Sequence, residues 1–404
     1  MNVKRSKNVV MLLSHDFLRP YADPRVYKEA KSLVGKKYDV SVVCWHEQGK
    51  NLPAYEEYEG IKVFRIFQSI PHYTTSLFWR FPFYKLYVFK SVVRSLKLKP
   101  YIIHCHDLDT LIIGVILKLF RKSLIFDAHE DFPGMLEWIY SKRLGHLARL
   151  CEKILIKFAD RVIAAEMPYT DIMKKHYGKT PVVVMNLPRL DSFHPKVDPS
   201  SVIRQYGLEG KVVISHIGGI GRNRGIYETL EALQYLESDD FRYLLIGRTT
   251  SEEWDRIRET IHRFSLEDKV VPIIDGVSYQ DIPRYYKASD ISMVLLYPIP
   301  NYVVSLPTKL FESLAVGTPV LAANLDYLNG VVTKHGFGLC ADPKDPEDIA
   351  AKLNTLISDK QARLRMGQNG LRAIQGEFNW DESEKRLIEL YEGMETPKPA
   401  LPAD

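Results

Sequence analysis

Histidines and carboxylates follow two neighbouring apolar runs in the N-terminal half of the sequence, at the points where β-strands would end. The set comprises His104, His106, Asp107, Asp109, Asp127, His129 and Glu130. Such residues suit a metal cluster or acid–base chemistry, and they equally well cap helices and bond to neighbouring loops. The residues alone leave these interpretations open.

A glycine-rich segment with two arginines lies between an apolar run and a helical pattern in the C-terminal half. It reads Ile217-Gly218-Gly219-Ile220-Gly221-Arg222-Asn223-Arg224-Gly225. Glycines let backbone N–H groups approach a phosphate closely, and guanidinium groups suit a diphosphate. An ordinary tight turn with solvated arginines explains the segment as well. Gly247-Arg248, after the next apolar run, is a second place where backbone and a cation could meet an anion.

This turn lacks the glycine spacing of the dinucleotide-binding fingerprint, and no acidic residue ends the next predicted strand about 20 residues further on. NAD binding is therefore disfavoured. The sequence also lacks the Walker pattern of P-loop proteins.

A third segment, Pro307-Thr308-Lys309-Leu310-Phe311-Glu312, begins a predicted helix. Its N-terminus would offer N–H groups and partial positive charge to an anion such as a sugar diphosphate. Lys309 lies in the first turn, where a cation opposes the helix dipole, and this weakly indicates that it faces an anion. Glu312 could accept hydrogen bonds from two hydroxyls of a ribose. A solvent-facing glutamate is the simpler interpretation of the local residues.

Several strings resemble segments of family 4 glycosyltransferases, which have the GT-B fold. PTKLFESLAVGTPV resembles their donor-site helix, HIGGIGRNRG their glycine-rich loop, and ASDISMVLLYP the strand before the donor helix. HCHDLDTL, FDAHEDFP and ADRVIAAEMPYTDIM match segments of the N-terminal domain. The resemblance covers nearly the whole chain and is most specific around Glu312.

The resemblance implies a GT-B α/β fold, with two Rossmann-like doubly wound domains facing a cleft. It implies sugar transfer from a nucleotide-diphosphate sugar to an acceptor hydroxyl, with retention of configuration. In the family a glutamate at the position of Glu312 binds the nucleotide ribose, and Arg224 matches a cation that contacts the diphosphate. The expected donor-binding residues are Gly218, Gly219, Arg222, Arg224, Arg248, Thr308, Lys309, Leu310 and Glu312.

On the N-terminal side, the resemblance places His129 near the transferred sugar, and His129 and Arg224 are the expected catalytic residues. His106 and Asp107 are expected on the acceptor side. Arg25 follows an Asp23-Pro24 helix start, which explains those two residues, and Arg25 could reach the cleft. No metal is expected, because a cation-rich site can stabilise a diphosphate leaving group by itself. The nucleotide sugar is a co-substrate, and no other cofactor is expected.

Two positions depart from the family pattern. The family often has a second glutamate eight positions before the one matching Glu312, and here that position is Val304. Its sugar contact is therefore missing, although many members with a similar helix also lack it. The first cation of the glycine-rich loop aligns with Gly219, and Arg222 is a candidate substitute.

β-Branched runs alternate with helical patterns along the chain, which predicts parallel sheets covered by helices. The predicted domains are 1–190 (acceptor side), 191–210 (a linker rich in Pro and Gly), 211–378 (donor side), 379–395 (a helix expected to pack back on the N-terminal domain) and 396–404 (a disordered tail). In open α/β sheets ligands bind beyond the carboxyl ends of the strands, so a cleft between two such domains is the expected site.

Charge is unevenly distributed over the 404 residues. Residues 1–190 contain 31 Lys and Arg against 18 Asp and Glu, while the remainder is acidic. Residues 60–106 contain no acidic residue, and within residues 79–99 cations alternate with aromatic residues. Such a helix could lie on an anionic membrane, or it could pack in the core with Leu86, Phe89, Val93 and Leu96 facing inward.

Other features narrow the class of protein. No apolar run is long enough to span a membrane, and the short run after Lys4, Arg5 and Lys7 does not fit a signal peptide. A cytoplasmic protein is expected, peripheral at the inner face of the membrane if residues 79–99 bind it. The four cysteines fit neither a zinc site nor a redox pair. No nucleic-acid motif is present.

The favoured hypothesis is a retaining, hexosyltransferase-like glycosyltransferase of cell-surface polysaccharide or glycolipid synthesis, with a glycan or lipid-linked acceptor. A nucleotide-sugar epimerase of the same fold would need no acceptor. Val304 motivates another alternative, an inactive homologue that only binds sugar nucleotides. A non-catalytic scaffold on an anionic membrane is a further alternative, motivated by the basic helix.

Overall fold

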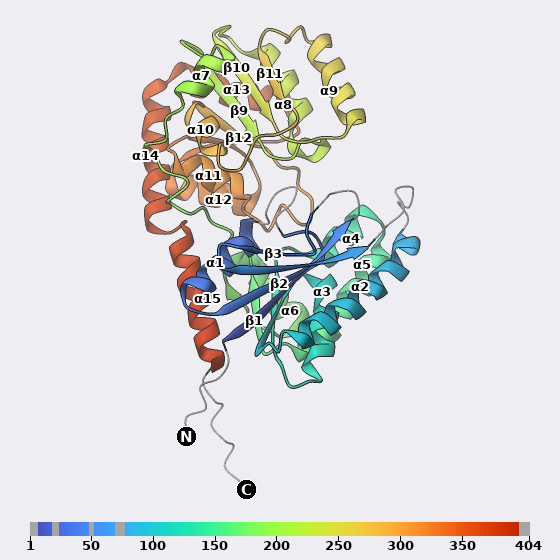
Figure 1. Ribbon diagram of the computed structural model, residues 1–404. Coiled ribbons are helices and arrows are strands. Elements are labelled where there is room, and N and C mark those ends of the chain that lie inside the picture. Colours follow the sequence, from blue (N-terminus) through green and yellow to red (C-terminus); the bar gives the residue numbers. More distant parts are fainter. Residues whose placement is uncertain (1–6, 18–23, 48–51, 69–76, 396–404) are drawn as a thin grey trace. The chain divides into compact units, whose positions relative to one another are not determined.

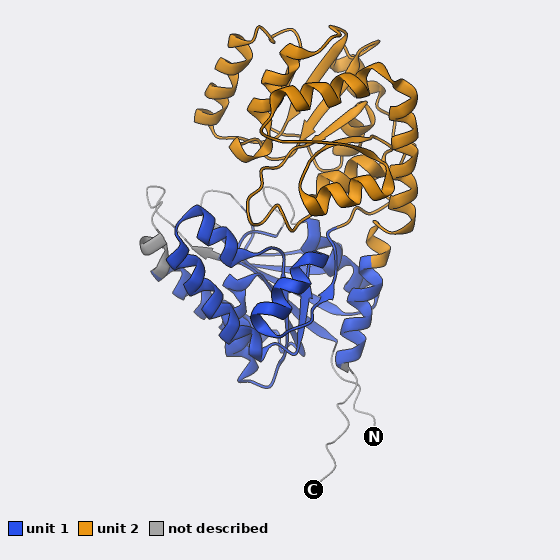
Figure 2. Ribbon diagram, turned by 180° about the vertical axis from the view of Figure 1, so that it is seen from behind, with its two compact units in different colours: residues 1–186, 383–404 blue, residues 187–382 orange. Residues whose placement is uncertain are grey.

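The structure, a computed structural model, describes residues 7–17, 24–47, 52–68 and 77–395 of the chain. The chain divides into two compact units (Figure 2). Unit 1 comprises residues 1–186 and 383–404, and unit 2 comprises residues 187–382. The predicted Asp23 cap and the predicted disordered tail lie outside the described residues.

Unit 1 is built on an eight-stranded sheet in the order β3-β4-β2-β1-β5-β6-β7-β8. Its strands are β1 (Asn8–Leu13), β2 (Asp39–Glu47), β3 (Tyr55–Tyr58), β4 (Ile61–Gln68), β5 (Ile102–His106), β6 (Ser123–Ala128), β7 (Arg161–Ala164) and β8 (Val182–Val183). All neighbours pair in parallel except β3 and β4. The central strands are buried on both faces, which explains their continuous apolar sequences.

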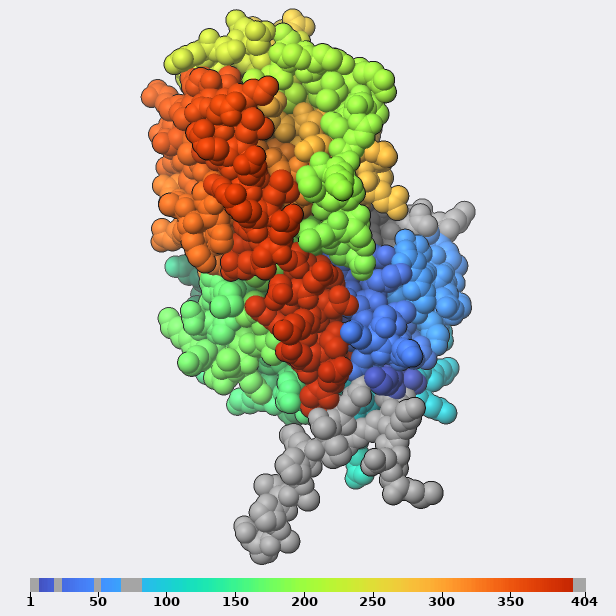
Figure 3. Space-filling view, turned by 90° about the vertical axis from the view of Figure 1, so that its left-hand side faces the viewer, coloured from blue at the N-terminus to red at the C-terminus, as the bar shows by residue number. Residues whose placement is uncertain are grey.

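Helices cover both faces of this sheet (Figure 1). They are α1 (Pro24–Gly35), α2 (Leu77–Lys97), α3 (Leu108–Lys118), α4 (Phe132–Ile139), α5 (Lys142–Leu155), α6 (Met167–Tyr177) and α15 (Trp380–Glu395). Helix α3 packs against both α2 and α5. From Ser383 onward α15 belongs to unit 1, where the hydroxyl of Tyr101 donates to the Met394 carbonyl at 2.8 Å. Figure 3 shows this part of α15 on the surface of unit 1.

Unit 2 contains a six-stranded parallel sheet in the order β11-β10-β9-β12-β13-β14. Its strands are β9 (Val212–Ile217), β10 (Phe241–Ile246), β11 (Val270–Ile273), β12 (Ile291–Val294), β13 (Val320–Ala323) and β14 (Gly338–Ala341). Its helices are α7 (Ser200–Tyr206), α8 (Ile226–Ala232), α9 (Ser251–Arg263), α10 (Ile282–Lys287), α11 (Thr308–Ala315), α12 (Asp326–His335), α13 (Pro346–Ser358) and α14 (Lys360–Gly376). Both units therefore have the Rossmann-like α/β architecture that was predicted.

The segment 191–210, predicted to be a linker between the domains, is part of unit 2 and contains helix α7. Pro199 precedes this helix, and Gly207 ends it in the left-handed conformation, with φ 59°. Val202 and Phe193 are buried. The Pro and Gly residues delimit a short helix here and do not abolish structure.

Helix α2 packs on the sheet through a different face from the one that the core-packing alternative predicts. Leu86, Phe89 and Val93 are 45%, 66% and 37% exposed, so the expectation that they face inward is wrong. Tyr87 sets the rotation of the helix, because its ring stacks on Trp45 and its hydroxyl donates to the Leu13 carbonyl. The side chains of residues 77–81 lie outside the described part of the structure. Among the described helices, none combines the length and apolar character needed to cross a membrane.

Candidate functional site

The glycine-rich turn of unit 2 follows the carboxyl end of β9, and close approach of two backbones explains two of its glycines. Gly218 has φ 135° and Gly247 has φ 159°, both unfavourable for residues with a side chain. A Cβ on Gly247 would lie 1.7 Å from the Gly218 carbonyl oxygen. A Cβ on Gly219 would meet nothing within 4 Å, so the turn has an open side. The backbone there is accessible to a ligand.

Four residues, which we call the Lys309 cluster, gather at this turn: His216, Gly218, Arg224 and Lys309. Lys309 comes from the first turn of α11, and its Cδ lies 4.0 Å from a Cβ placed on Gly218. Arg224 is close enough to repel its ammonium group and lies over the ring of Tyr302, 5.0 Å from the centroid. The structure thus brings Arg224, Gly218 and Lys309 together, as the resemblance implied.

The charge of Lys309 has no counter-ion among the described residues. Its side chain is only 8% exposed, and its Nζ is buried without a hydrogen-bond partner in the described structure. Burial and then Arg224 lower the pKa of Lys309 to about 7. A buried, unpartnered ammonium beside a second cation is costly unless an anion binds there.

His216 was not predicted, although it is fully buried and stands one residue before the end of β9. Its Nε2 lies 3.2 Å from the Gly219 carbonyl oxygen. Burial and then Lys309 lower the pKa of His216 well below its usual value, so the ring is neutral and donates to that carbonyl. His216 therefore holds the glycine-rich turn without adding charge. A histidine near the end of a mostly apolar strand was the signal for it.

The side chains of the other predicted cations of unit 2 have partners outside the Lys309 cluster, although the Arg248 carbonyl accepts the Ile220 N–H of the glycine-rich turn at 3.1 Å. The Arg222 side chain is exposed, and its Nε lies 3.8 Å from Glu253 on α9. Arg248 donates from Nε to the Asp275 carbonyl at 3.4 Å and is exposed. These side-chain partners of Arg222 and Arg248 are not members of the Lys309 cluster, so the structure does not group the two arginines with it.

Thr308 and Leu310, two predicted donor-binding residues at the start of α11, differ in their exposure. Thr308 is half-buried and opens the helix. Leu310 is fully buried, and its backbone N–H donates to the Pro307 carbonyl at 2.9 Å. Leu310 thus presents neither its side chain nor its N–H to a donor, and we correct its assignment to a packing residue.

Glu312 is not the solvent-facing glutamate of the simpler interpretation, since it is 6% exposed. Its carboxylate accepts a hydrogen bond from the Tyr279 hydroxyl at 2.9 Å. Burial and then Glu312 raise the pKa of that hydroxyl well above its usual value, so it remains a donor. Tyr279 was not predicted, because it lies far from α11 in the sequence and in no recognisable motif. Its ring packs 5.5 Å from that of Phe193.

In unit 1 the predicted residues meet at the carboxyl ends of β5 and β6, where His106 and Asp127 are register partners. We call Arg25, His106, Asp107, Asp127 and His129 the His129 cluster. His129 Nε2 lies 3.0 Å from His106 Nδ1 and 3.3 Å from Asp127. Its Nδ1 lies 3.3 Å from Asp107. His129 is therefore held between two carboxylates.

The environment keeps His129 protonated. Burial by itself lowers the pKa of His129, but Asp107 and Asp127 outweigh it and raise the pKa to about 10. Asp107 adopts φ 63°, ψ 168°, a conformation disfavoured for residues with a side chain, and its carboxylate also accepts the His129 backbone N–H at 3.0 Å. The His129 side chain is 16% exposed and can donate from a fixed position.

Arg25 does not reach the surface, so its expected direct contact with the acceptor is corrected. It is 2% exposed, pairs with Asp127 through Nη2 at 2.7 Å and Nε at 3.0 Å, and donates to the Val184 carbonyl. His106 is 1% exposed and likewise acts behind His129. Both residues position other side chains, whereas Asp107 is partly exposed.

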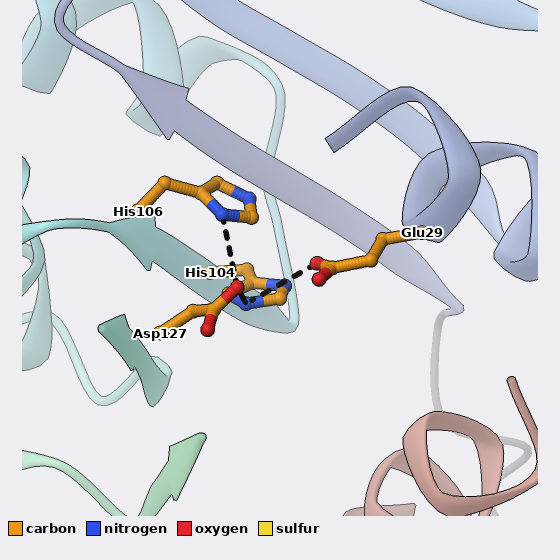
Figure 4. Close-up of side chains that lie close together, drawn as sticks. All are labelled: Glu29, His104, His106 and Asp127. Carbon is orange, nitrogen blue, oxygen red and sulfur yellow. Dashed lines mark ion pairs between the residues drawn. The ribbon is translucent and has the colours of Figure 1, made fainter. Parts of the chain in front are cut away.

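Glu29, His104, His106 and Asp127 lie close enough together to be considered as metal ligands (Figure 4). Burial raises the pKa of Glu29, and the negative charge of Asp127 raises it further. Burial lowers the pKa of His104, and the charge of His106 adds to this effect, so Glu29 and His104 are both neutral. Both carboxylate oxygens of Asp127 already accept from Arg25, and His104 Nδ1 lies 2.8 Å from the Tyr391 hydroxyl. A divalent cation would have to displace Arg25 from Asp127, so the Arg25–Asp127 ion pair disfavours a metal site here.

Two Rossmann-like units, one of them with a glycine-rich turn beside unpaired cations, define the GT-B class of proteins. The family model for glycosyl transferases group 1 matches residues 201–373, and that for glycosyltransferase family 4 matches residues 24–187. The two models cover both halves of the chain, which therefore belongs to the GT-B glycosyltransferases related to family 4.

Individual relatives agree with this assignment. An uncharacterized glycosyltransferase of Methanocaldococcus jannaschii is 23% identical over 90% of this chain and 91% of its own length. D-inositol 3-phosphate glycosyltransferase of Corynebacterium efficiens is 28% identical over 72% of this chain and 70% of its own. Both are glycosyltransferases by name, as the family match requires.

Solved structures share the fold. Sucrose-phosphate synthase of Thermosynechococcus elongatus superposes with a TM-score of 0.80 at 18% identity, covering 96% of this chain and 99% of its own. HepE of Anabaena, in complex with UDP-glucose, superposes with a TM-score of 0.75 at 17% identity, covering 95% and 99%. The arrangement of elements in this chain is thus that of a GT-B protein.

Proposed function

We propose that this glycosyltransferase moves a sugar from a nucleotide-diphosphate sugar to an acceptor hydroxyl with retention of configuration. The observation that carries the proposal is the buried Lys309 ammonium beside Arg224, which has no counter-ion among the described residues. A diphosphate would supply the missing negative charge. It would also gain from the open backbone of the glycine-rich turn at Gly219.

Catalysis in this proposal comes mainly from stabilising the leaving nucleoside diphosphate. Negative charge develops on the diphosphate as the bond to the sugar breaks. Preorganised cations in a site shielded from water stabilise such charge more strongly than solvated ones. Arg224 and Lys309 meet this requirement, so we expect no metal, and turnover should persist in the presence of EDTA.

We assign the nucleoside end of the donor to Glu312. Its carboxylate accepts a hydrogen bond from the Tyr279 hydroxyl and lies one helical turn beyond Lys309. A carboxylate so placed can accept hydrogen bonds from ribose hydroxyls. The HepE relative is named as a complex with UDP-glucose, which makes a uridine nucleotide the first probe to test.

We assign the acceptor side, or a hydroxyl of the transferred sugar, to His129 in unit 1. The imidazolium is fixed by two carboxylates and partly exposed, so it can donate a charge-assisted hydrogen bond. Asp107 orients it. The acceptor in this proposal is a glycan or a lipid-linked saccharide of cell-surface polysaccharide or glycolipid synthesis, and an anionic membrane in contact with α2 is a partner.

The test begins with a thermal-shift screen of the purified protein against a panel of nucleotide sugars, since a bound ligand raises apparent stability. Donor turnover is then measured with and without candidate acceptors. Turnover that depends on the acceptor supports the transferase, whereas conversion of the donor alone indicates an epimerase. Binding without any turnover indicates the inactive homologue.

Glu312→Ala tests the donor assignment directly. We expect donor affinity to fall by roughly tenfold, because the ribose would lose a charge-assisted hydrogen bond. Glu259→Ala, on the exposed side of α9, is the matched control and should bind as the wild type. Equal donor affinities of the two variants in calorimetry would remove Glu312 from the site.

A further inference from the structure

Helix α5 of unit 1 exposes a stripe of large apolar side chains. Leu147, Leu150 and Ile154 are 57%, 54% and 51% exposed, and Phe158, just beyond the helix, is 46% exposed. Their spacing of three or four residues places them along one side of the helix. The opposite side, with Ala148 and Glu152, is buried in unit 1. The stripe is therefore an exposed apolar surface on the side of α5 that does not pack into unit 1.

Cations flank this stripe, and exposed carboxylates are missing from it. The cations are Lys142, Arg143, Lys153 and Lys157, all exposed. None of them pairs with an acid in the described part of the chain. The only acidic residue between positions 138 and 158 is Glu152, which is buried and accepts a hydrogen bond from Tyr177. We call the stripe and its flanking cations the α5 face.

Neighbouring helices of the same unit also carry exposed apolar side chains. Helix α3 packs against both α5 and α2, and Leu119 beyond its end is 78% exposed. Helix α2 adds the exposed Phe89 and Lys90 in a segment without acidic residues. Figure 1 shows α2, α3 and α5 together in unit 1. Exposed apolar side chains thus occur on or next to three helices that pack together, and exposed cations accompany them on α5 and α2.

We propose that the α5 face, with the exposed sides of α2 and α3, binds the surface of an anionic phospholipid bilayer. Apolar side chains enter the boundary between headgroups and acyl chains, while Lys and Arg meet the lipid phosphates. This combination of exposed leucines with unpaired cations is complementary to such a bilayer in both polarity and charge.

A second copy of the chain fits this surface less well. A two-fold dimer buries the same patch on both subunits, so the cations of one α5 face would meet those of the other. With Glu152 buried, no exposed carboxylate of the α5 face would relieve that repulsion. Charge complementarity therefore favours the bilayer as the occupant.

The inference rests on the proposed function for its purpose, because a membrane-bound enzyme can reach a lipid-linked acceptor. Its test needs neither donor nor transfer. Full-length protein is sedimented with vesicles of phosphatidylcholine alone and of phosphatidylcholine mixed with phosphatidylglycerol. We expect binding to the mixed vesicles, weakened by salt, and little binding to the neutral ones.

Two variants separate the apolar and ionic contributions. Leu147→Ser with Leu150→Ser should weaken binding to the mixed vesicles by roughly tenfold or more, because less apolar surface enters the bilayer. Lys153→Gln with Lys157→Gln should weaken it by a similar factor and reduce its salt dependence. All four positions are exposed, so the fold should tolerate the changes. Leu364→Ser with Arg365→Gln, exposed on α14 of unit 2, is the matched control.

Wild-type protein that ignores the mixed vesicles, or α5 variants that bind like the control, would overturn the inference. So would a dimer in sedimentation velocity that the leucine variant abolishes, or binding that an oligonucleotide competes away. Calorimetry with UDP on the same samples keeps the proposals apart. Protein that binds UDP but not vesicles refutes the membrane surface alone, and protein that binds vesicles but no nucleotide refutes the donor site alone.

Discussion

The His129 cluster and the Lys309 cluster each contain a buried cation, Arg25 in the first and Lys309 in the second, yet only the first contains its own counter-ions. Arg25 pairs with Asp127, and His129 lies between Asp127 and Asp107. Unit 1 thus contains a closed network in which the cations have their counter-ions, whereas Lys309 and Arg224 of unit 2 have no carboxylate partner among the described residues. The difference predicts that removing a charge destabilises unit 1 and stabilises unit 2.

Removing a charge from the closed network should have the largest effect. Asp127→Ala leaves Arg25 buried without its partner, and we expect unit 1 to lose about 3–5 kcal/mol of stability. Hydrogen exchange of the β5 and β6 amides measures this loss within unit 1. Asp240→Ala, which removes the partner of Lys211 at the surface, should change stability by about 0.5 kcal/mol or less. Equal losses in the two variants would contradict the closed network.

Removing a charge from the Lys309 cluster should instead raise the stability of unit 2. Lys309→Met replaces an unpartnered buried ammonium by an apolar side chain, so unit 2 should gain about 1 kcal/mol or more. Affinity for UDP should nevertheless fall by about 10–100-fold, because a charge-assisted hydrogen bond is lost. Chemical denaturation and calorimetry measure the two effects, with Lys334→Met as the surface control. Loss of stability together with unchanged affinity would remove the contrast between the clusters.

His129 belongs to the closed network and is partly exposed to solvent. Its replacement should affect turnover and not donor affinity. His129→Ala should lower kcat by at least roughly tenfold, since one charge-assisted hydrogen bond is lost. In the wild type, kcat should fall as the pH rises through about 10, where the imidazolium loses its proton. Steady-state kinetics with donor calorimetry tests this, and His262→Ala, on the exposed side of α9, is the control. Unchanged kcat would exclude His129 from the reaction.

The smallest effect concerns Tyr279, which touches Glu312 and was found only in the structure. Tyr279→Phe removes the hydroxyl that holds the carboxylate, and we expect donor affinity to fall by a few-fold, about 1 kcal/mol or less. Tyr235→Phe, an exposed tyrosine of unit 2, serves as the control. A donor affinity equal to that of the control would show that Glu312 needs no such support.

The sequence predicted the architecture well because apolar periodicity and glycine turns are local signals. The alternation of β-branched runs with helical patterns predicted the parallel sheets of both units. Strands β3 and β14 are more weakly patterned, because their residues, apart from the buried Ala341, are half-exposed or exposed. The rotation of α2 was missed, because it depends on the contact between Tyr87 and Trp45, which are distant in sequence.

The candidate site was predictable where neighbours in sequence carry it, as in the turn from Gly218 to Arg224 and the start of α11. It was not predictable where one side chain determines the role of another far along the chain. Arg25 was expected to reach the acceptor side of the cleft, and only the fold shows that Asp127 holds it inside. The pairing of Tyr279 with Glu312 depends on the same kind of long-range contact.

The central claim is that the Lys309 cluster binds the donor diphosphate, and proton uptake on binding tests it most directly. Free Lys309, with a pKa of about 7, is largely neutral at a pH one unit higher, and a bound diphosphate should restore its charge. Calorimetric titration of UDP at that pH, in buffers of different ionisation enthalpy, should show uptake of about one proton. The uptake should be absent from Lys309→Met and retained in Lys334→Met, and UDP affinity should decline as the pH rises. Wild-type protein that binds UDP with no more proton uptake than Lys309→Met would contradict the account.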